Sequence, residues 1–420
     1  MEFIAHINPN TNKTQSVKTH LQNTAELCSN ILKDVKLFNA GYILGLLHDL
    51  GKYSDDFQNY IRNGGVKGTV LHTFAAVYLL MENYHDKEMD FYRRIANEML
   101  AITISSHHGL VDCRDFETGE YELVHRRTTD VENSKQSIDR FYSEVISKEE
   151  LDAYYTLAID EIVSFIDGTF QKKDRQKSHF DWNLPLRYVS SALSNADKID
   201  TIQFNYQYYG KQLVPDWNRY LFNLDNIYKD FQENPVGDLK LNQIKQEISD
   251  TCAQRGVELA PGVYRLNLPT GAGKTYSSLR FALNHLLEHD MLGIFYVAPF
   301  CSILEQNSES IKRVIDDNGL FEHFSNDIND FDRENAALFD WYAKDTWDAG
   351  VITTTLAQML LTFFGGRSSS VRRFSALYKK VIIFDEIHQI PSDQISLFNM
   401  MIKTRPFNTN IPWQHTITAS

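Results

Sequence analysis

The stretch that most constrains the fold is LNLPTGAGKTYSSLRFALNHLL, residues 266–287. It reads as an apolar strand, a glycine-containing loop and a helix, which is the order that a nucleotide phosphate site requires. Backbone amides of the loop and the helix N-terminus would surround phosphate oxygens, Lys274 would reach the terminal phosphates and Thr275 would ligate magnesium. The stretch therefore predicts an ATP site, formed on this side by Thr270, Gly271, Ala272, Gly273, Lys274 and Thr275.

A second stretch, KVIIFDEIHQIP at residues 380–391, supplies the acids that such a site needs. Its apolar run predicts a buried strand that ends in Asp385 and Glu386. We expect Asp385 to hold the magnesium through water and Glu386 to polarise the attacking water. An ordinary acidic turn after a strand would look the same, but Lys274 and Thr275 upstream in an α/β pattern favour the nucleotide site.

The two halves of the chain differ in the spacing of their apolar residues. From Val17 to about Ala196 they recur at helical spacing, which predicts an all-α domain, although residues 113–135 show no sustained period and are interpreted as a loop. The later strand candidates, VYRLNL, GIFYVAP, GVITTT, KVIIFDE and HTITAS, alternate with helical stretches and predict a parallel sheet with helices on both faces. The expected domains are an all-α domain at 1–205, a linker with short helices at 206–240 and an α/β domain at 241–420.

Histidines and aspartates in the helical half form the other candidate site. Neutral imidazoles hold borderline transition metals, and a carboxylate can bridge two ions about 3.5 to 4 Å apart for in-line attack on a phosphodiester. Taken singly, each residue has a structural explanation: His48 could end a helix, and the chain carries 14 histidines. The joint pattern favours a metal site inside a helical bundle. Its candidate ligands are His20, His48, Asp49, His72, His107, His108 and Asp197.

The order of these ligands, H, HD, H, HH and D, resembles the HD phosphohydrolase superfamily. The histidine doublet and HDLGK at residues 48–52 resemble the nuclease domain of the CRISPR-associated type I interference helicase-nucleases. The resemblance implies that the catalytic Asp49 bridges two metals, and that Lys52 places a cation near the scissile phosphate; a solvated lysine after a glycine turn is the alternative. One metal would be held with His20, His48 and Asp197, and the other with His72, His107 and His108.

The form PTGAGKT, in which Leu268 stands where the common phosphate loop begins with glycine, resembles superfamily 2 helicases and implies a RecA-like lobe. Within that resemblance His388 completes a DExH box and would couple the ATP state to DNA. Gln243 or Gln246 would read adenine. YVAPFCSILEQN and ITTTLAQML resemble elements that grip the backbone of single-stranded nucleic acid. They imply DNA contacts from Pro299, Gln306, Thr353 and Thr354.

TITAS at residues 416–420 resembles the helicase motif that links ATP hydrolysis to strand separation, which implies coupling roles for Thr418 and Ser420. A superfamily 2 motor needs a second RecA-like lobe that closes over ATP and supplies an arginine finger worth roughly 10³ to 10⁵ in rate. The sequence ends at Ser420. We therefore expect this polypeptide alone to be nuclease-competent but a poor ATPase until a second lobe is supplied in cis or in trans.

Together the resemblances imply a metal-dependent single-stranded DNA nuclease with an ATP-dependent 3′ to 5′ helicase module. It would be recruited to a guide-RNA surveillance complex and would degrade the displaced non-target strand in type I CRISPR interference. Histidine-rich ligation favours manganese, nickel, cobalt or iron in the nuclease site, whereas magnesium suits the oxygen-rich ATP site.

Two other classes remain open: an HD-type nucleotide phosphohydrolase that acts on a small molecule, and a nucleic-acid binding or remodelling module that does not cleave. The net charge of −13 restricts any DNA contact to a local groove. The four cysteines are widely separated, and the longest apolar runs fall short of a membrane span, so a cytoplasmic protein without a membrane partner is expected.

Overall fold

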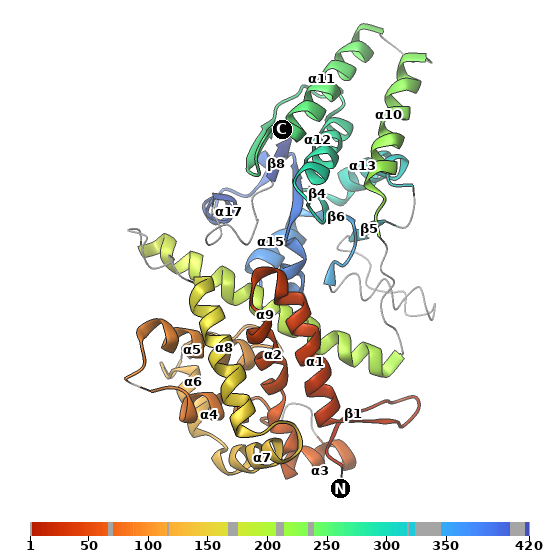
Figure 1. The fold of residues 1–420 in the computed structure, drawn as a ribbon. Coiled ribbons are helices and arrows are strands. Elements are labelled where there is room, and N and C mark those ends of the chain that lie inside the picture. Colours follow the sequence, from red (N-terminus) through yellow and green to blue (C-terminus); the bar gives the residue numbers. More distant parts are fainter. Residues whose placement is uncertain are drawn as a thin grey trace. The chain divides into compact units, whose positions relative to one another are not determined.

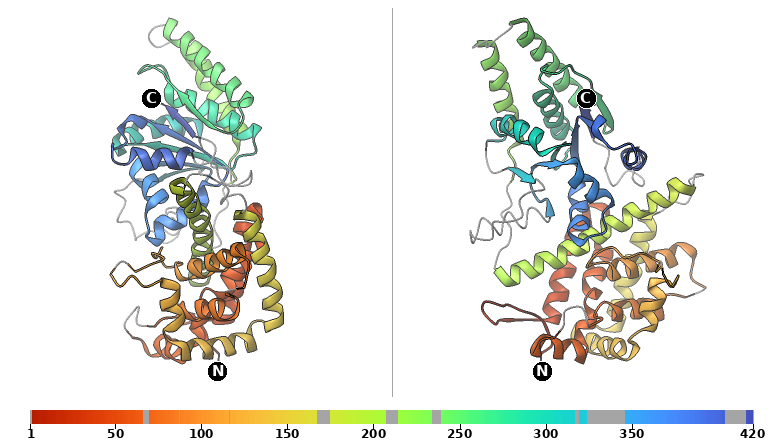
Figure 2. Two further views of the ribbon diagram at one scale, coloured as in Figure 1. Left: turned by 90° about the vertical axis from the view of Figure 1, so that its left-hand side faces the viewer. Right: turned by 180° about the vertical axis from the view of Figure 1, so that it is seen from behind.

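A computed structural model of the chain describes residues 2–65, 70–86, 88–115, 117–166, 175–206, 214–233, 239–316, 319–323, 346–403 and 416–419. These residues form two compact units, drawn in Figure 1 and from two further sides in Figure 2. Unit 1 comprises Met1–Tyr209 and Gly366–Ser375, and unit 2 comprises Gly210–Gly365 and Ala376–Ser420.

Unit 1 is mostly helical. The α1 and α2 helices pack along each other, and α8 and α9 pack against this pair. The described helices of Met1–Tyr209 are α1 (Val17–Leu32), η1 (Lys33–Val35), α2 (Phe38–Leu47), η2 (Leu50–Tyr53), α3 (Asp55–Asn63), α4 (Phe74–Asn83), α5 (Phe91–Ser105), α6 (Glu122–Thr128), α7 (Val131–Glu144), α8 (Lys148–Ile166) and α9 (Arg175–Tyr206).

Two parts of unit 1 differ from the sequence prediction. The N-terminal residues form an antiparallel pair of strands, β1 (Ile4–Ile7) and β2 (Thr14–Ser16), so the unit is not wholly α. The expected loop at 113–135 contains α6 and the start of α7. The buried face of α7 carries Ser134 and Ser137 beside Ile138 and Phe141. Because serines occupy half of that buried face, the apolar residues alone do not recur at helical spacing, and the helix could not be recognised from them.

The α9 helix is 32 residues long, contains Pro185 and carries Asp197. A short segment from much later in the sequence, with α16 at Ser368–Arg372, packs on it within unit 1. Ser191 Oγ donates a hydrogen bond to the Arg372 carbonyl at 2.7 Å, and Phe374 is fully buried. The helix that presents Asp197 is therefore anchored by residues distant in the sequence.

Unit 2 is built on a parallel sheet. Its described strands are β3 (Val263–Leu266), β4 (Gly293–Ala298), β5 (Leu320–His323), β6 (Val351–Thr355), β7 (Lys380–Asp385) and β8 (Thr416–Ala419), in the spatial order β3-β8-β7-β4-β6-β5. Every described pairing is parallel, which confirms the predicted sheet type. The β5 edge strand was not predicted.

Helices lie on both faces of this sheet, as predicted. On one face Ile294, Tyr296 and Ala298 of β4 share a core with α10 (Trp217–Glu233), α12 (Lys274–Glu288) and α13 (Cys301–Val314). On the other face Phe384 of β7 packs edge-on against Phe398 of α17 (Ile395–Lys403), with ring centroids 5.0 Å apart. Alternate strand residues thus serve opposite layers. The remaining described elements of unit 2 are α11 (Leu239–Glu258), α15 (Leu356–Phe364) and η5 (Ile387–Gln389), whereas η4 (Arg373–Leu377) begins in unit 1 and ends in unit 2.

The interpretation of residues 206–240 as a linker with short helices does not hold for α10. This helix is 17 residues long, and Tyr220, Leu224 and Tyr228 on one of its faces lie in the core of unit 2. The four-residue spacing of these side chains places them on one stripe. None of the described helices is both long and apolar enough to cross a bilayer.

Candidate metal and nucleotide sites

The seven predicted metal ligands converge in unit 1 from separate elements. His20 lies on α1, His48 and Asp49 follow α2, and Asp197 lies on α9, whereas His72 precedes α4 and the His107–His108 pair follows α5. They form two groups whose ligand atoms lie within 4.8 Å of one another, and Asp49 belongs to both. The groups are His20, His48, Asp49 and Asp197, and Asp49, His72, His107 and His108.

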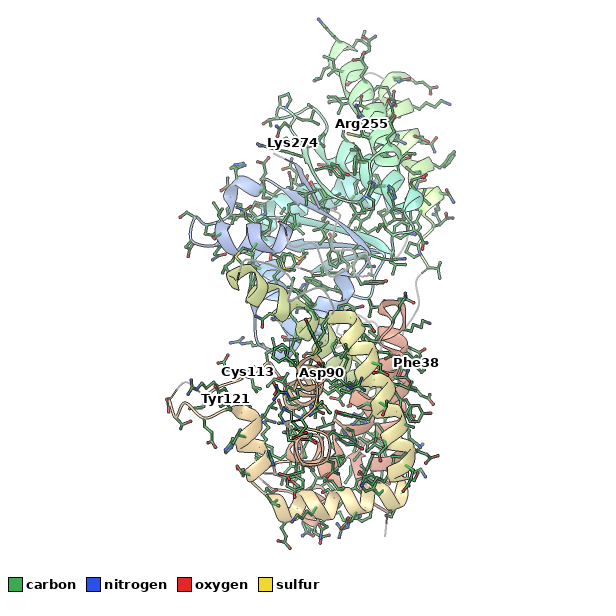
Figure 3. All side chains as sticks on the ribbon, turned by 60° about the vertical axis from the view of Figure 1, so that its left-hand side comes forward. Phe38, Asp90, Cys113, Tyr121, Arg255 and Lys274 are labelled. Atoms are coloured by element: carbon green, nitrogen blue, oxygen red, sulfur yellow. The ribbon has the colours of Figure 1, made fainter. Side chains whose placement is uncertain are left out.

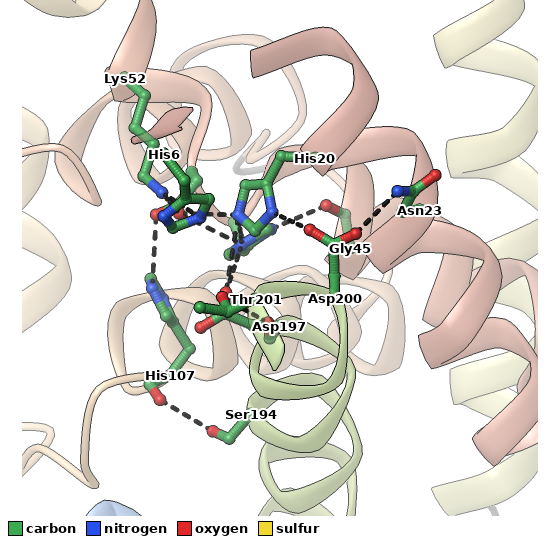
Figure 4. A network of polar contacts seen from close by, with 12 residues as sticks. His6, His20, Asn23, Gly45, Lys52, His107, Ser194, Asp197, Asp200 and Thr201 are labelled. Carbon is green, nitrogen blue, oxygen red and sulfur yellow. Dashed lines mark hydrogen bonds and ion pairs between the residues drawn. The ribbon is translucent and has the colours of Figure 1, made fainter. Parts of the chain in front are cut away.

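Asp49 is placed as a bridge between these groups. Its Oδ2 lies 3.2 Å from His20 Nε2 and 3.3 Å from His48 Nε2. Its Oδ1 lies 3.5 Å from both His72 Nε2 and His107 Nε2. Each carboxylate oxygen therefore faces a different set of imidazoles, which is the arrangement that lets one carboxylate serve two cations. Figure 4 shows part of this network.

The imidazoles are held in one orientation by hydrogen bonds on their far side. His48 Nδ1 lies 2.8 Å from the Gly45 carbonyl, and His107 Nδ1 lies 2.7 Å from the Ile104 carbonyl. His72 Nδ1 faces the Val70 carbonyl at 3.3 Å. Since a carbonyl can only accept, each Nδ1 carries a proton, and each Nε2 faces the cluster, where it can bind a metal once it carries no proton. This is the tautomer that metal-binding histidines need.

The sequence reasoning missed Asp200, which orients His20. Asp200 Oδ2 accepts from His20 Nδ1 at 2.6 Å, and its carboxylate is also held by Gln15 Nε2 at 2.9 Å and Asn23 Nδ2 at 2.7 Å (Figure 4). Asp200 is three residues after Asp197, so both project from neighbouring positions on α9. That i, i+3 spacing in NADKID was the available signal.

The glycine of HDLGK has a packing role. The backbone N–H of Gly51 donates to the carbonyl of His72 at 3.1 Å, and a Cβ on Gly51 would lie 2.1 Å from that oxygen. Any side chain here would push His72 away from Asp49. HDLGK therefore contains the two candidate ligands His48 and Asp49 and also the glycine whose close contact positions His72.

Lys52 is buried and not solvated. Its Nζ lies 2.7 Å from Asp49 Oδ2 and 3.3 Å from His6 Nε2. Burial, followed by the Lys52 charge, lowers the pKa of His6 to about 2, so this imidazole is neutral and can accept from Lys52. His6 is a second residue that the sequence reasoning missed, since it lies on a strand that was not predicted.

The carboxylates of the cluster favour a positive charge beside them. Burial opposes protonation of His48, yet Asp49 and Asp197 outweigh it and raise the pKa of His48 to about 10. Burial likewise disfavours the charged form of Asp49, but Lys52 and His48 hold its pKa well below the usual range. Both carboxylates are thus ionised in a buried setting, where a metal cation can replace the His48 proton.

The residues present fit divalent metal ions. Asp49 Oδ1 and His107 Nε2 are buried and make no hydrogen bond among the described residues. Buried polar atoms without partners are rare and call for an explanation such as an ion. The imidazole-rich donor set suits transition metals better than magnesium.

The predicted phosphate loop and acid pair meet in unit 2. They line a pocket of about 540 Å³, within the range of about 300 to 1,000 Å³ usual for small-molecule sites. Lys274 begins α12 (Figure 3), and its Nζ pairs with Glu386 Oε1 at 3.0 Å. Gly271 and Gly273 have φ of 83° and 85°, the left-handed conformations that let the loop turn its amides inward. Of the six predicted loop residues, Ala272 does not line the pocket.

Asn307 was not predicted and joins the two halves of this pocket. Its Oδ1 accepts from Thr275 Oγ1 at 3.1 Å, and its Nδ2 donates to Asp385 Oδ2 at 3.1 Å. Burial raises the pKa of Asp385, and its Oδ1 is buried without a hydrogen-bond partner among the described residues. Thr275 and Asp385 are thereby held where a magnesium ion would lie between them.

The other predicted residues of unit 2 occupy varied positions. Gln306 lines the nucleotide pocket, and Pro299 lies between β4 and α13. Thr353 and Thr354 are fully buried in β6, where Thr354 Oγ1 donates to the His323 carbonyl at 3.1 Å.

Of the coupling residues, His388 lies 3.2 Å from Glu386 Oε2, and Thr418 pairs with Phe384 in the sheet register. Ser420 lies outside the described residues. Gln243 and Gln246 do not line the pocket.

The chain is similar in sequence to known proteins. Residues 238–410 match the family described as type III restriction enzyme, res subunit. A Methanocaldococcus jannaschii protein named as a CRISPR-associated nuclease/helicase Cas3 is 23% identical over 81% of this chain and 49% of its own length. The Haloferax volcanii Cas3 nuclease/helicase is 27% identical over 32% of this chain and 16% of its own length.

Solved structures give the same result for the fold. All of this chain aligns with 49% of T. fusca Cas3 at a TM-score of 0.55 and 14% identity, and with 49% of its ATP complex at a TM-score of 0.57 and 15% identity. The chain spans about half the length of the first of these curated relatives and of these structures. In sequence and in fold, the chain is similar to part of the CRISPR-associated Cas3 nuclease/helicases.

Proposed function

We propose that unit 1 is an HD-type, metal-dependent nuclease domain that cleaves single-stranded DNA, and that unit 2 is an ATP-binding superfamily 2 helicase lobe. The observation that carries the nuclease proposal is the convergence of six other ligands around the shared Asp49 carboxylate. A structural histidine cluster has no need of one carboxylate that faces two imidazole groups. The proposed domain limits are 1–205 for the HD domain and 241–420 for the RecA-like lobe, except that α10 belongs to the latter and Gly366–Ser375 to the former.

Different residues of unit 1 would bind the two metals and attract the phosphate. His20, His48, Asp49 and Asp197 would hold one transition metal, and Asp49, His72, His107 and His108 the other. Such metals supply an activated water and a Lewis acid for in-line phosphodiester cleavage. Lys52 keeps Asp49 ionised and adds positive charge beside it, which favours the approach of a phosphate.

In unit 2 the Thr270–Thr275 loop would bind the phosphates of ATP, while Asp385 and Thr275 would hold magnesium. Glu386 would orient the attacking water, and His388, Thr418 and Ser420 would transmit the ATP state to DNA. Pro299 and Gln306 are the proposed DNA contacts, because they lie outside the buried β6 strand, whereas Thr353 and Thr354 would need that strand end to open. By analogy with the Cas3 relatives, the partners would be displaced single-stranded DNA and a guide-RNA surveillance complex.

The test uses circular single-stranded DNA, which has no ends. The protein is incubated with manganese, nickel, cobalt or magnesium, and each reaction is repeated with EDTA and with Asp49→Ala. Asp139→Ala, at an exposed position on α7, is the matched control. We expect linearised and degraded circles with at least one transition metal, loss in EDTA and in Asp49→Ala, and full activity in the control.

The other outcomes assign the other functions. Intact circles together with hydrolysis of free nucleotides would identify a small-molecule phosphohydrolase. Binding of the circles without cleavage under any metal would identify a non-cleaving module. Either result would overturn the nuclease proposal.

A further inference from the structure

The α9 helix presents a stripe of polar side chains to the metal cluster. Ser194, Asp197 and Asp200 follow one another at three-residue spacing, which keeps them on one side of the helix. Asp197 belongs to the same group as His20 and His48, and its Oδ1 lies 3.6 Å from His20 Nε2. Asp200 orients His20 through the Nδ1 contact described above. These two positions of the stripe therefore serve the first metal group.

Ser194, the remaining member of the stripe, contacts the other group. Its Oγ donates a hydrogen bond to the carbonyl of His107 at 2.8 Å, and both residues are almost inaccessible to solvent (Figure 4). Serine hydroxyls inside helices can bond the carbonyl four residues earlier, whereas this hydroxyl crosses to a different element. The imidazole of His107 faces Asp49 Oδ1 in the second group. One side of α9 thus carries a ligand of the first group and holds the main chain of a ligand of the second.

The main chain of His107 is held less firmly by the helix that precedes it. The α5 helix ends at Ser105, and the backbone N–H of His107 lies 3.4 Å from the Ile104 carbonyl. This distance is longer than the usual range of about 2.7 to 3.2 Å, and the same carbonyl is shared with the ring Nδ1. A further contact from outside α5 follows, because the Leu110 N–H donates to the Gly366 carbonyl at 2.9 Å. The position of this turn therefore depends on contacts beyond its own helix.

The segment that contains this glycine, residues 366–375, is in turn fixed to α9 within unit 1. Ser191 Oγ and Asn195 Nδ2 both donate to the Arg372 carbonyl, at 2.7 Å and 2.8 Å. The turn after α5 is therefore joined to α9 twice, directly through Ser194 and indirectly through this segment.

We propose that Ser194 is a positioning residue that fixes the separation of the two metal ions. The inference rests on the proposed metal-dependent nuclease, and it specifies a residue that binds no metal itself but keeps the two ions together. In-line cleavage by two metals needs ions about 3.5 to 4 Å apart. Asp49 provides one link between the two groups. Ser194 provides a second, because it ties His107 to the helix that carries Asp197.

The experiment measures manganese binding to the full chain by isothermal titration calorimetry. The magnetic coupling between two bound ions is followed by low-temperature electron paramagnetic resonance. For the unaltered chain we expect two ions and the multiline signal of a coupled pair. In Ser194→Ala we expect the second ion to bind about tenfold more weakly, the lower end of the usual loss for residues that orient a metal ligand. The first ion should keep its affinity, and the coupled signal should decrease even at saturating manganese.

Two comparisons isolate the hydroxyl. Ser190→Ala, one turn earlier on α9, removes a buried hydroxyl that has no hydrogen-bond partner among the described residues, so it should leave both ions unchanged. Ser194→Thr and Ser194→Val have nearly the same shape and differ in the hydroxyl. Ser194→Thr should retain the coupled pair and Ser194→Val should lose it, whatever the added methyl group does to the unfolding temperature of both.

The outcomes separate the positioning role from the metal site itself. Unchanged affinity and coupling in both Ser194→Ala and Ser194→Val would overturn the positioning role and leave a two-metal site in place. Equal weakening of both ions in every Ser194 variant, Ser194→Thr included, would show that the residue only supports the fold, and would overturn the role as well. An unaltered chain that binds no pair of manganese ions would overturn the proposed metal site and this inference with it.

Discussion

The metal cluster of unit 1 and the nucleotide pocket of unit 2 differ in how their charges are balanced. In the cluster, Asp49 and Asp197 are both ionised and Lys52 pairs with Asp49, so further positive charge must come from the His48 proton or a metal. In the pocket, Lys274 pairs with Glu386. The cluster therefore retains negative charge that favours a bound cation, whereas Lys274 must leave its ion pair before it can bind a phosphate.

The largest expected effect tests whether Asp49 joins both metal groups. Asp49→Ala should abolish high-affinity binding at both, with a loss of about 10³ in manganese affinity, because each group loses its shared anionic ligand. Metal content by mass spectrometry and affinity by calorimetry are the measurements, with Asp139→Ala as control. Retention of two metals per chain in Asp49→Ala would refute the bridge.

Lys52→Ala provides a contrast at the same carboxylate. It should leave metal affinity undiminished, because the metal no longer competes with an ammonium for Asp49, and should lower DNA cleavage by about a hundredfold, the lower end of the usual range for one charge-stabilising side chain. A parallel collapse of metal binding would show that Lys52 only supports the fold.

A second expected effect concerns the orientation of His20. Asp200→Asn keeps the shape but removes the anionic acceptor from His20 Nδ1, and loss of such an outer contact usually costs roughly 10- to 100-fold in metal affinity. Manganese titration measures the loss, and Asp200→Glu should restore part of it. Affinity equal to that of the unaltered chain would show that Asp200 has no role in orienting the ligand.

A further prediction follows from the His48 proton. Its pKa is raised from 6.5 to about 10 in the folded protein, so His48 stabilises the metal-free fold fully below about pH 6.5 and this contribution is lost as pH rises through 10. A bound metal must displace that proton. Manganese affinity should therefore increase by up to about tenfold per pH unit between pH 6.5 and 9.

Calorimetry in two buffers with different ionisation enthalpies should detect the released proton directly. Binding that is independent of pH over this range, with no proton release, would contradict the raised pKa.

The smallest expected effect tests the internal ion pair of the nucleotide pocket. Glu386→Gln should tighten binding of a non-hydrolysable ATP analogue by roughly threefold, since a half-exposed ion pair is worth about 0.2 to 1 kcal/mol. The same change should remove any ATP hydrolysis. Glu305→Gln, at an exposed position on α13, is the control. Weaker binding in Glu386→Gln would mean that the carboxylate itself contacts the nucleotide complex.

The two sites were not equally accessible to sequence reasoning. The phosphate loop is one continuous strand, loop and helix, so its backbone is dictated locally, and the structure places Lys274 and Thr275 at the start of α12 in the lining of the pocket. The metal ligands lie on elements as far apart as α1 and α9, and it was their joint pattern and a family resemblance, not a local motif, that suggested that they meet. The structure brings all seven together, yet it also shows Asp200 and His6, for which no motif spacing was recognised.

The errors in the fold have a common cause. The α10 helix was interpreted as linker because Pro215 and Pro235 flank it, and α7 was partly interpreted as loop because serines occupy its buried face. In both cases the packing partners decide the structure. In α10, for example, Tyr220, Leu224 and Tyr228 form a buried helix face because they pack into one core with α12 and α13. Propensity and period are weak evidence where packing supplies most of the helix stability.

The amino-acid sequence alone determined the chemical types and order of the metal ligands and the phosphate loop with its acid pair. These are local properties, because side-chain chemistry and short-range backbone geometry are written into neighbouring residues. Only the tertiary structure decided which oxygen of Asp49 faces which imidazoles, that Gly51 must lie against the His72 carbonyl, and that Lys274 is paired with Glu386. Such relations depend on how distant elements pack, and that is settled by burial of complementary surfaces rather than by any single stretch of sequence.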